Sequence, residues 1–335
     1  MFKKIGLLAC LIFILVLAIL IAGCSSGVDK PEVTDHDLQP ITAMLDWVPN
    51  TNHTGLYVAL EKGWFEEEGL QMDIVQPTEG GTPQLVATGK AQFGVGYQED
   101  ITQARANGVP VVSIAAVIQH NTSGFASKKE EGITRPRDME GKRYGGWGSP
   151  MEKAVLQAVL EADGGDFSQT DIIDIGTADF FTAIERNVDF AWIYYGWTGI
   201  EAELRGMDLN FLELPKLDPA LDFYTPVLIT NEELIAENPA LVKKFMRAAA
   251  KGYRFAIDKP EEAAQILLKH SPELDKELVL ASQKYLSPRY QGDAKRWGEQ
   301  KAEVWHNFAG WMYERDLLPQ MIDTKKAFTN EFLPQ

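Results

Sequence analysis

The chain has 335 residues, of which 48 are acidic and 32 are basic, and its formal net charge is −16. Such acidity disfavours nucleic-acid binding, because a protein needs Lys and Arg to neutralise phosphates. The only two cysteines, Cys10 and Cys24, lie within the first 24 residues. Cysteine nucleophiles, disulfides and cysteine metal clusters are therefore excluded for the folded part that we expect after them.

Residues 1–23 have the order of an export signal. Lys3 and Lys4 precede an uninterrupted apolar stretch at 5–22, and Gly23 and Cys24 follow it. A permanent membrane anchor is the alternative, because about 18 apolar residues could just span a bilayer. The end of the stretch, IAGC, resembles the lipobox of bacterial lipoproteins, which implies cleavage before Cys24 and acylation of its thiol. Lipid would then hold the folded part at the outer face of the cell membrane.

Cleavage before Cys24 would remove Lys3 and Lys4 and change the formal charge from −16 to −18. Residues 24–40 are polar, contain prolines and lack hydrophobic periodicity, so they predict a flexible tether. From Ile41 onward about 295 residues remain. We expect two domains, because a single core rarely grows to that size.

Residues 41–128 alternate short apolar runs with longer amphipathic ones. The runs ITAMLDW, LQMDIVQ and AQFGVGY are separated by segments such as GLYVALEKGWFEEEG. This alternation predicts strands separated by helices, and a largely parallel sheet. We assign these residues to the first part of lobe 1.

A charged, turn-rich segment at 130–148 opens a second, smaller series of strands and helices, which we assign to lobe 2 at 129–221. YTPVLITN (224–231) is then predicted to be a strand that returns to lobe 1, and the rest of 222–335 is mainly amphipathic helix. The sequence therefore predicts an α/β fold in which two connections join two lobes. That architecture suits hinge closure around a ligand.

Candidate binding residues lie in the loops that follow strands, because ligands of open α/β sheets sit beyond the carboxyl ends of the strands. Asn50 favours a turn, and Thr51 or Asn52 could simply cap the next helix. Gly81 and Thr82 could present backbone N–H groups, but the P-loop pattern GxxxxGK[ST] is absent. The aromatic- or amide-rich loops are DWVPNTNH (46–53), TEGGTPQ (78–84), GYQED (96–100), GGWGSPMEK (145–153) and IYYGW (193–197).

Aromatic residues at the strand ends of both units indicate a planar ligand held by stacking. Trp192 is the exception, and we predict that it lies in the core. The same loops hold the carboxylates of Asp46, Glu99, Asp100 and Glu152, whereas their only basic residue is Lys153. This charge favours an amino-substituted heterocycle that donates N–H bonds over an anion.

Catalytic motifs are missing from the sequence. The five histidines are scattered, and neither HExxH nor GxSxG occurs. Metal and triad chemistry therefore have no support at this level, and we expect no catalytic residues, no metal and no cofactor.

The segments LDWVPNTNHTGLYVALEKGWFEEEGL and EGGTPQLVATGKAQFGVGY resemble the thiamine-pyrimidine-precursor branch of the periplasmic-binding-protein family, which also includes nitrate, sulfonate and taurine binders. The resemblance covers about 41–257, and AWIYYGWTGIEAE is most similar to the N-formyl-aminopyrimidine-binding lipoproteins of thiamine salvage. It implies a type II two-lobe fold with the ligand cleft between the lobes. It also implies a monomer that delivers its ligand to the permease and ATPase subunits of an ABC importer.

One branch of this family is enzymatic, and its pyrimidine-precursor synthases use a lysine-bound pyridoxal phosphate, a nearby histidine and a cysteine-rich motif. Aligning their strand-end segment with FGVGYQED places Gly96 at the lysine and Asp100 at the histidine, and the cysteine motif is missing. The resemblance thus implies a binder rather than an enzyme. The alternatives are a riboflavin, sulfonate or nitrate binder, an exported pyrimidine-processing enzyme and a sensor module.

Loop identity within the family implies the ligand contacts. Three aromatic rings are expected to stack on the ligand or to form the walls of the site. They are Trp47, Trp147 and Tyr195. Asn50 and Glu99 are expected to hydrogen-bond to it. The second choices are His53, Tyr97, Tyr194 and Trp197.

Overall fold

The computed structural model describes residues 38–77, 81–176 and 178–335. The predicted signal peptide, the lipidation site Cys24 and the tether as far as residue 37 lie outside these ranges. Strand β1 (Gln39–Met44) begins two residues before Ile41, where we expected the folded part to start. Within the described ranges, none of the helices combines the length and apolar character needed to cross a membrane.

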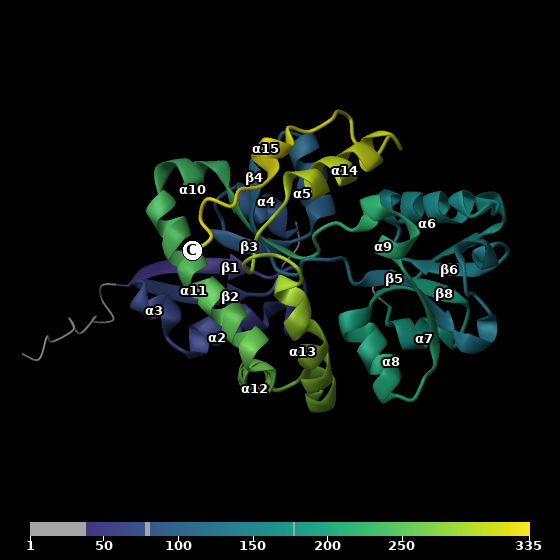
Figure 1. The fold of residues 1–335 in the computed structure, drawn as a ribbon, viewed down its shortest axis with the longest axis horizontal. Coiled ribbons are helices and arrows are strands. Elements are labelled where there is room, and N and C mark those ends of the chain that lie inside the picture. The colour runs from purple at the N-terminus through teal and green to yellow at the C-terminus, as the bar shows by residue number, and fades with distance from the viewer. Residues whose placement is uncertain (1–37, 78–80, 177) are drawn as a thin grey trace, which may run out of the picture. The chain divides into compact units, whose positions relative to one another are not determined.

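The first sheet has the strand order β2-β1-β3-β10-β4 (Figure 1). β1 pairs in parallel with β2 and β3, whereas β10 runs antiparallel to both β3 and β4. Four of the five strands therefore run in one direction, as the largely parallel prediction requires. The other strands are β2 (Leu70–Val75), β3 (Phe93–Gly96), β4 (Val111–Ala116) and β10 (Val227–Asn231).

The second sheet repeats this pattern with the order β7-β6-β8-β5-β9. Here β5 is the antiparallel strand, between β8 and β9. The boundary expected at residue 128 was therefore wrong, because it placed β5 in lobe 1, whereas its backbone hydrogen bonds belong to the second sheet. The strands are β5 (Ser123–Lys128), β6 (Arg143–Gly146), β7 (Asp171–Asp174), β8 (Phe190–Tyr194) and β9 (Leu209–Glu213).

Helices cover both sheets (Figure 1). With the first sheet go α2 (Thr54–Glu61), α3 (Trp64–Glu67), α4 (Thr82–Ala87), α5 (Gln98–Ala106), α10 (Glu232–Glu237), α11 (Pro239–Asp258), α12 (Pro260–His270), α13 (Lys276–Gln291), α14 (Ala302–Tyr313) and α15 (Thr324–Ala327). With the second go α6 (Pro150–Ala162), α7 (Phe180–Ile184), α8 (Ile200–Leu204) and α9 (Leu214–Leu217). Single turns are η1 (Thr51–His53), η2 (Lys129–Glu131), η3 (Pro136–Met139), η4 (Phe167–Gln169), the π-helical η5 (Tyr195–Gly199) and η6 (Pro219–Leu221).

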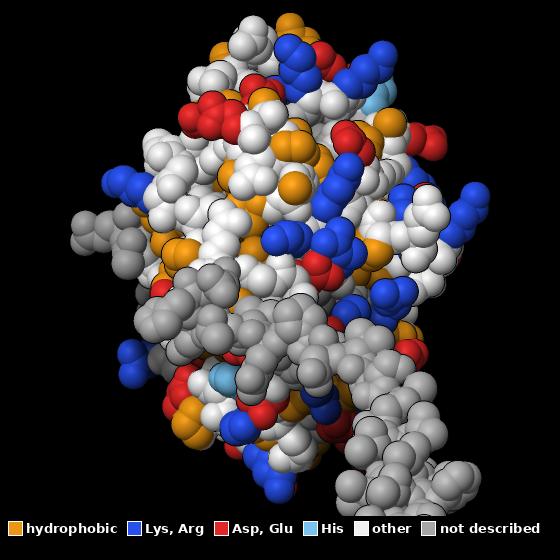
Figure 2. All heavy atoms as spheres, turned by 90° about the vertical axis from the view of Figure 1, so that its left-hand side faces the viewer, with side chains coloured by type: hydrophobic (Ala, Val, Ile, Leu, Met, Phe, Trp, Pro, Cys, Tyr) orange, Lys and Arg blue, Asp and Glu red, His pale blue; other side chains and the backbone are white. Residues whose placement is uncertain are grey.

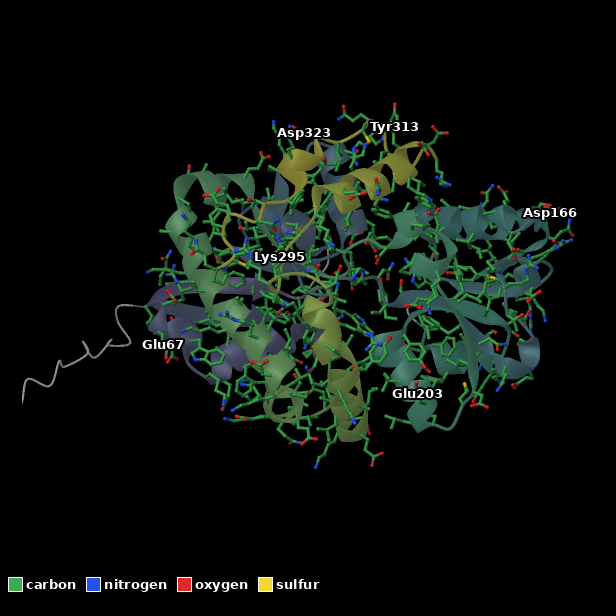
Figure 3. All side chains as sticks on the ribbon, in the orientation of Figure 1. Glu67, Asp166, Glu203, Lys295, Tyr313 and Asp323 are labelled. Carbon is green, nitrogen blue, oxygen red and sulfur yellow. The ribbon has the colours of Figure 1, made fainter. Side chains whose placement is uncertain are left out.

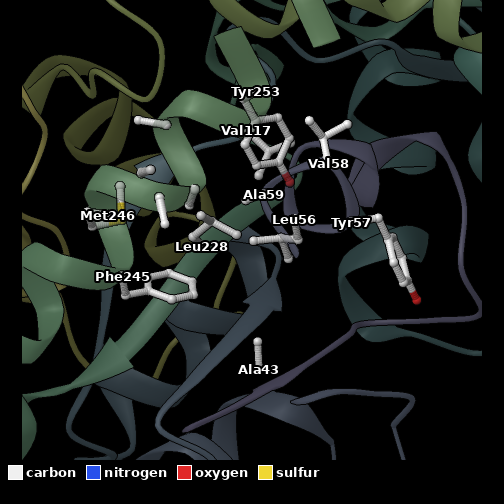
Figure 4. Close-up of a cluster of buried hydrophobic side chains, with 14 of the residues drawn as sticks. Ala43, Leu56, Tyr57, Val58, Ala59, Val117, Leu228, Phe245, Met246 and Tyr253 are labelled. Atoms are coloured by element: carbon white, nitrogen blue, oxygen red, sulfur yellow. The ribbon is translucent and has the colours of Figure 1, made fainter. Parts of the chain in front are cut away.

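Two glycines allow α2 and α11 to cross at backbone contact. A Cβ on Gly252 would lie 1.8 Å from the carbonyl oxygen of Gly55, so no larger residue fits there without a shift. Next to this crossing, Leu56, Phe245 and Tyr253 belong to the main buried cluster (Figure 4). Because α2 follows directly on the predicted binding loop 46–53, this packing fixes the base of that loop.

The surface of the same helices carries mixed charge. On the face drawn in Figure 2, Lys and Arg side chains are interspersed with Asp and Glu. Arg247 Nε of α11 lies 2.9 Å from Glu68 Oε1, and Lys251 Nζ lies 3.0 Å from Glu67 Oε2. Exposed pairs of this kind contribute only about 0.2–1 kcal/mol each, so the apolar cluster carries the association of α11 with α3.

His120 connects the two crossover segments that join the sheets. Its Nδ1 lies 2.7 Å from Asp222 Oδ2 in the second crossover, and its Nε2 lies 3.1 Å from Asp293 Oδ1 in the loop after α13. The backbone N–H of Asn121 donates to Asp222 Oδ1 at 2.9 Å. The hydrogen bond and negative charge of Asp222, together with Asp293, raise the pKa of His120 to about 9.

We expect His120→Gln to lower the free energy of unfolding at pH 6 to 7, because Gln keeps hydrogen-bonding capacity but loses the positive charge. A raised histidine pKa means that this stabilisation is complete below the unfolded value of 6.5 and is lost as the pH rises through about 9. The effect should be small, since the imidazole is half exposed and solvent screens it.

Urea unfolding between pH 6 and pH 10 measures this difference. The exposed His306 of α14 offers a matched control, since His306→Gln should leave the free energy of unfolding near that of the parent protein. A difference between His120→Gln and the parent that stayed constant up to pH 10 would contradict the charged role of His120.

Candidate functional site

Asp46 lies two residues beyond β1 and connects two neighbouring strand ends. Its Oδ1 is 2.6 Å from His53 Nε2, and its Oδ2 accepts a hydrogen bond from the hydroxyl of Tyr97, which follows β3. Burial acts to raise the pKa of Asp46, but the hydrogen bonds from His53 and Tyr97 outweigh it, so the pKa is lowered. Asp46 is therefore a carboxylate whose two oxygens are both engaged.

The orientation of His53 follows from its own loop. The backbone N–H of Asn50 donates to His53 Nδ1 at 3.2 Å, so Nδ1 must accept and the ring proton lies on Nε2, which faces Asp46. The side chain of Asn50 caps η1, because its oxygen accepts from the N–H of Asn52 at 2.9 Å and its Nδ2 donates to the oxygen of Val48 at 3.0 Å. Both predicted residues thus shape the loop, and ligand contact by either stays a prediction.

Tyr97 and Tyr194 bring the two sheets together. Tyr194 is the last residue of β8 in the second sheet, and its ring centroid lies 6.4 Å from that of Tyr97 with 19° between the ring planes. Burial raises the pKa of each phenol, and negative charge on Asp46 adds to it. The two rings therefore form a neutral, nearly parallel aromatic pair that belongs half to each sheet.

Glu99 and Asp100 occupy the first turn of α5. Glu99 is 9% exposed, and its Oε2 has no hydrogen-bond partner among the described residues. Burial raises the pKa of Glu99 well above its ordinary value, and the negative charge of Asp100 adds to it. Asp100 keeps a solvent-exposed face, but desolvation by the surrounding protein and the charge of Asp46 raise its pKa to about 6.

A cavity of about 530 Å³ opens beside these groups. It lies at the carboxyl ends of β1 and β3, and the described residues that line it include no Lys, Arg or His. No group of three or more His, Cys, Asp or Glu side chains within the described ranges is placed to hold a metal ion. The polar lining consists of carboxylates, amides and hydroxyls, from Asp46, Thr82, Gln84, Tyr97, Asp100, Gln103 and Asn107.

The two predicted tryptophan walls are exposed on different sheets. Trp47 is 53% exposed after β1, and Trp147 is 45% exposed after β6. The ring of Trp147 lies 5.5 Å from that of Trp192, and its backbone N–H donates to the Glu152 carboxylate at 3.1 Å. Neither ring is committed to the core, so both are free to contact a ligand.

The remaining predicted aromatic residues, Tyr195 and Trp197, lie in η5 and pack against neighbouring elements. The ring of Tyr195 lies 5.5 Å from that of Tyr285 on α13, and its hydroxyl donates to Glu203 of α8, which Figure 3 labels. Trp197 packs against the main core cluster of the first sheet. These contacts give both residues a structural role, and ligand contact by them stays a prediction.

Sequence reasoning did not assign several groups to the site, among them Gln103 and Asn107 of the cavity lining. Asp46 and Asp100 were recognised only as loop carboxylates, although both line the cavity. Trp192 is buried as predicted and packs against Phe125, but its indole Nε1–H has no acceptor among the described residues. The position of Asp46 directly after a strand was the available signal for the first, whereas the sequence offered none for Trp192.

We expect Asp46→Asn to lower the free energy of unfolding by about 1–3 kcal/mol, because an amide turns an N–H₂ group toward one of the two donors. Since the pKa of Asp46 is lowered in the folded protein, its stabilisation is complete above the unfolded value of 3.8 and is lost as the pH falls through the folded value.

Urea unfolding of Asp46→Asn at pH 7 and at pH 3 measures both expectations. Asp73→Asn, on the exposed side of β2, is the matched control. Equal stability of the Asp46 and Asp73 variants at pH 7 would show that the strand ends do not depend on this carboxylate.

Comparison with known proteins finds relatives that are named as binding proteins and relatives that are named as synthases. The NMT1/THI5-like family matches residues 50–263. A formylaminopyrimidine-binding protein of Halalkalibacterium halodurans is 32% identical over 98% of each chain. A 4-amino-5-hydroxymethyl-2-methylpyrimidine phosphate synthase of Legionella pneumophila is 26% identical over 88% of this chain and 92% of its own. The riboflavin-binding protein RibY of Chloroflexus aurantiacus is 26% identical over 89% and 87%.

Solved structures resemble the whole folded part. The periplasmic aliphatic sulphonate binding protein SsuA of Escherichia coli superimposes with a TM-score of 0.69 at 16% identity, covering 89% of this chain and 94% of its own. At this identity the likeness concerns the fold alone. It confirms the predicted two-lobe periplasmic-binding-protein fold, with one sheet in each lobe.

Proposed function

Because the chain belongs to the NMT1/THI5-like family, we propose that it is the substrate-binding lipoprotein of an ABC importer and captures a thiamine pyrimidine precursor of the formylaminopyrimidine type. The relative of 32% identity, which matches over nearly the full length of both chains, supports this ligand class.

One observation in the structure carries the ligand assignment. Carboxyl groups of Asp46, Glu99 and Asp100 gather beside the Tyr97–Tyr194 ring pair, and the described lining of the adjoining cavity holds no cationic side chain. An aminopyrimidine offers a flat ring for the aromatic pair and N–H donors for the carboxyl groups. A sulfonate or nitrate would instead require Arg, Lys or several free N–H donors.

Stacking alone is too weak for import from dilute solution. A dissociation constant between nanomolar and micromolar corresponds to about 8–12 kcal/mol. Two aromatic contacts add only about 0.5–1.5 kcal/mol each beyond surface burial. Buried area and hydrogen bonds to charged groups must therefore supply most of the binding free energy, and closure of both lobes on the ligand would supply the buried area.

Riboflavin is the second candidate ligand. The cavity of about 530 Å³ is larger than a single pyrimidine ring needs, and one relative of 26% identity is named for riboflavin binding. A three-ring flavin would use the same aromatic pair and extend further into the amide-lined part of the cavity.

An exported pyrimidine-processing enzyme is the rival class of function, because one relative is named as a synthase. Gly96 and Asp100, which align with the lysine and histidine of that branch, both line the cavity. A glycine has no amine with which to bind an aldehyde cofactor, which supports the binder. Recovery of the pyrimidine chemically unchanged after incubation and denaturation would agree with this, and a new product would contradict it.

The anchoring proposal rests on IAGC at the end of the apolar stretch 5–22. Mass spectrometry of membrane-extracted protein should find an N-terminus at Cys24 that carries acyl chains, and an intact chain that begins at Met1 and behaves as an integral membrane protein would contradict it.

Calorimetry against formylaminopyrimidine, hydroxymethylpyrimidine, riboflavin, taurine and nitrate tests the ligand assignment. We expect the two pyrimidines to bind at micromolar concentration or below, and the two anions not to bind. Tight binding of taurine or nitrate, with no binding of either pyrimidine, would overturn the ligand class while leaving the fold intact.

We expect Trp47→Ala to weaken pyrimidine binding at least tenfold, about 1.4 kcal/mol, without a comparable loss of thermal stability. The reason is that the ring is more than half exposed in the free protein and has little packing to lose. Calorimetry gives the affinity, and the melting temperature of the empty protein gives the stability. A large fall in melting temperature with unchanged affinity would assign Trp47 to packing.

A further inference from the structure

Glu99 has an unusual position for an acidic residue. It is 9% exposed, and its Oε2 is buried without a hydrogen-bond partner among the described residues. Buried polar atoms normally have hydrogen-bond partners. An unpaired one beside a proposed binding site is therefore a position where a ligand atom can supply the missing hydrogen bond.

The groups around Glu99 supply no positive charge. Asp100 follows it on α5, Asp46 and Tyr97 lie at the ends of β1 and β3, and Tyr194 reaches it from the second sheet. His53 faces Asp46, and its Nε2–H donates a hydrogen bond to that carboxylate. No Lys or Arg in the described ranges is among the groups that shift the pKa of Glu99. An ionised carboxylate in such surroundings would be buried, unpaired and repelled by its neighbour.

The amino end of α5 acts in the opposite direction, because free N–H groups at a helix start favour negative charge. Burial and the charge of Asp100 outweigh it, and the pKa of Glu99 is raised well above its usual value. A carboxyl group that is buried, unpaired at Oε2 and next to a second carboxyl group favours its neutral form, which has one O–H donor and one carbonyl acceptor.

We propose that Glu99 recognises the ligand as a neutral acid, with its O–H donating to a ring nitrogen and its carbonyl oxygen accepting from the adjacent exocyclic amine. This inference rests on the proposed function and adds the chemical class that the site selects, a neutral heterocycle in which an acceptor nitrogen stands next to an N–H donor. An ionised Glu99 offers only acceptors and would repel the lone pair of the ring nitrogen.

The location of Glu99 agrees with this pairing. Glu99 is among the groups that affect the pKa of both Tyr97 and Tyr194, so its carboxyl group lies near both phenols. A flat ring that contacts this aromatic pair would turn its polar edge toward the carboxyl group. One of the two hydrogen bonds then satisfies Oε2, which has no partner among the described residues in the empty protein.

The test uses Glu99→Gln and Glu99→Ala in the full-length protein, with formylaminopyrimidine as the titrant in calorimetry. A glutamine amide presents the same donor and acceptor pair as a neutral acid. We expect Glu99→Gln to bind within about threefold of the parent protein and Glu99→Ala to bind at least tenfold more weakly. The exposed Glu303 of α14 is the matched control, and Glu303→Gln should leave the affinity unchanged.

Proton linkage separates a neutral Glu99 from an ionised one. Because the acid already holds its proton, titrations in buffers of different ionisation enthalpy should show no net proton uptake at pH 7. The affinity of the parent protein should fall as the pH rises through the raised pKa of Glu99, whereas that of Glu99→Gln should not. Uptake of about one proton, together with a tenfold loss in Glu99→Gln, would show an ionised Glu99 that pairs with a pyrimidinium and would overturn the inference.

Infrared spectroscopy of the empty protein reads the protonation state without any ligand. The carbonyl band of a protonated carboxyl group should be present at pH 7 in the parent protein and absent in Glu99→Gln. Lack of this band would overturn the inference about Glu99 but would leave the proposed function standing. Lack of any pyrimidine binding by the parent protein would instead overturn the proposed function, and the ligand pairing with it.

Discussion

The Asp46 carboxylate is the interaction on which the arrangement of the site depends. It accepts hydrogen bonds from His53 in its own loop and from Tyr97 at the end of the neighbouring strand. It therefore connects the carboxyl end of β1 to that of β3. Because both oxygens are engaged, the loop 46–53 and the ring of Tyr97 hold a fixed relation. That relation places Tyr97 against Tyr194, and the aromatic pair exists only when both sheets are in place.

The surrounding charge gives this scaffold its chemical character. Donors around Asp46 lower its pKa, burial and the neighbouring Asp100 raise the pKa of Glu99 well above its usual value, and the pKa of Asp100 is about 6. Three carboxyl groups within one small region thus have three different proton affinities, and each difference follows from the partners within reach. A site with this charge repels anions.

The helices behind the site explain how an acidic, hydrogen-bonded loop keeps its shape. Gly55 and Gly252 let α2 and α11 meet at backbone contact, and the hydroxyl of Tyr253 donates to the carbonyl oxygen of Asn52 at 2.8 Å. On the other side, Thr51 Oγ1 lies 2.6 Å from Ser282 Oγ on α13. The loop is therefore tied to two helices that the chain adds only after the second sheet is complete, so the site requires the whole fold.

The sequence by itself determined the alternation of strands and helices, the division into two α/β units and the loops that carry polar and aromatic residues. These features follow from hydrophobic periodicity and turn chemistry, which are local. It could not determine that β5 pairs with β8 and β9, because the sequence of a short strand does not specify which sheet it joins. Nor could it separate exposed Trp47 from structural Tyr195, or show that Glu99 is buried beside Asp100 with no Lys or Arg of the described ranges among the groups that shift its pKa. Burial, tautomer and proton affinity depend on neighbours distant in the chain, so only the tertiary structure decided them.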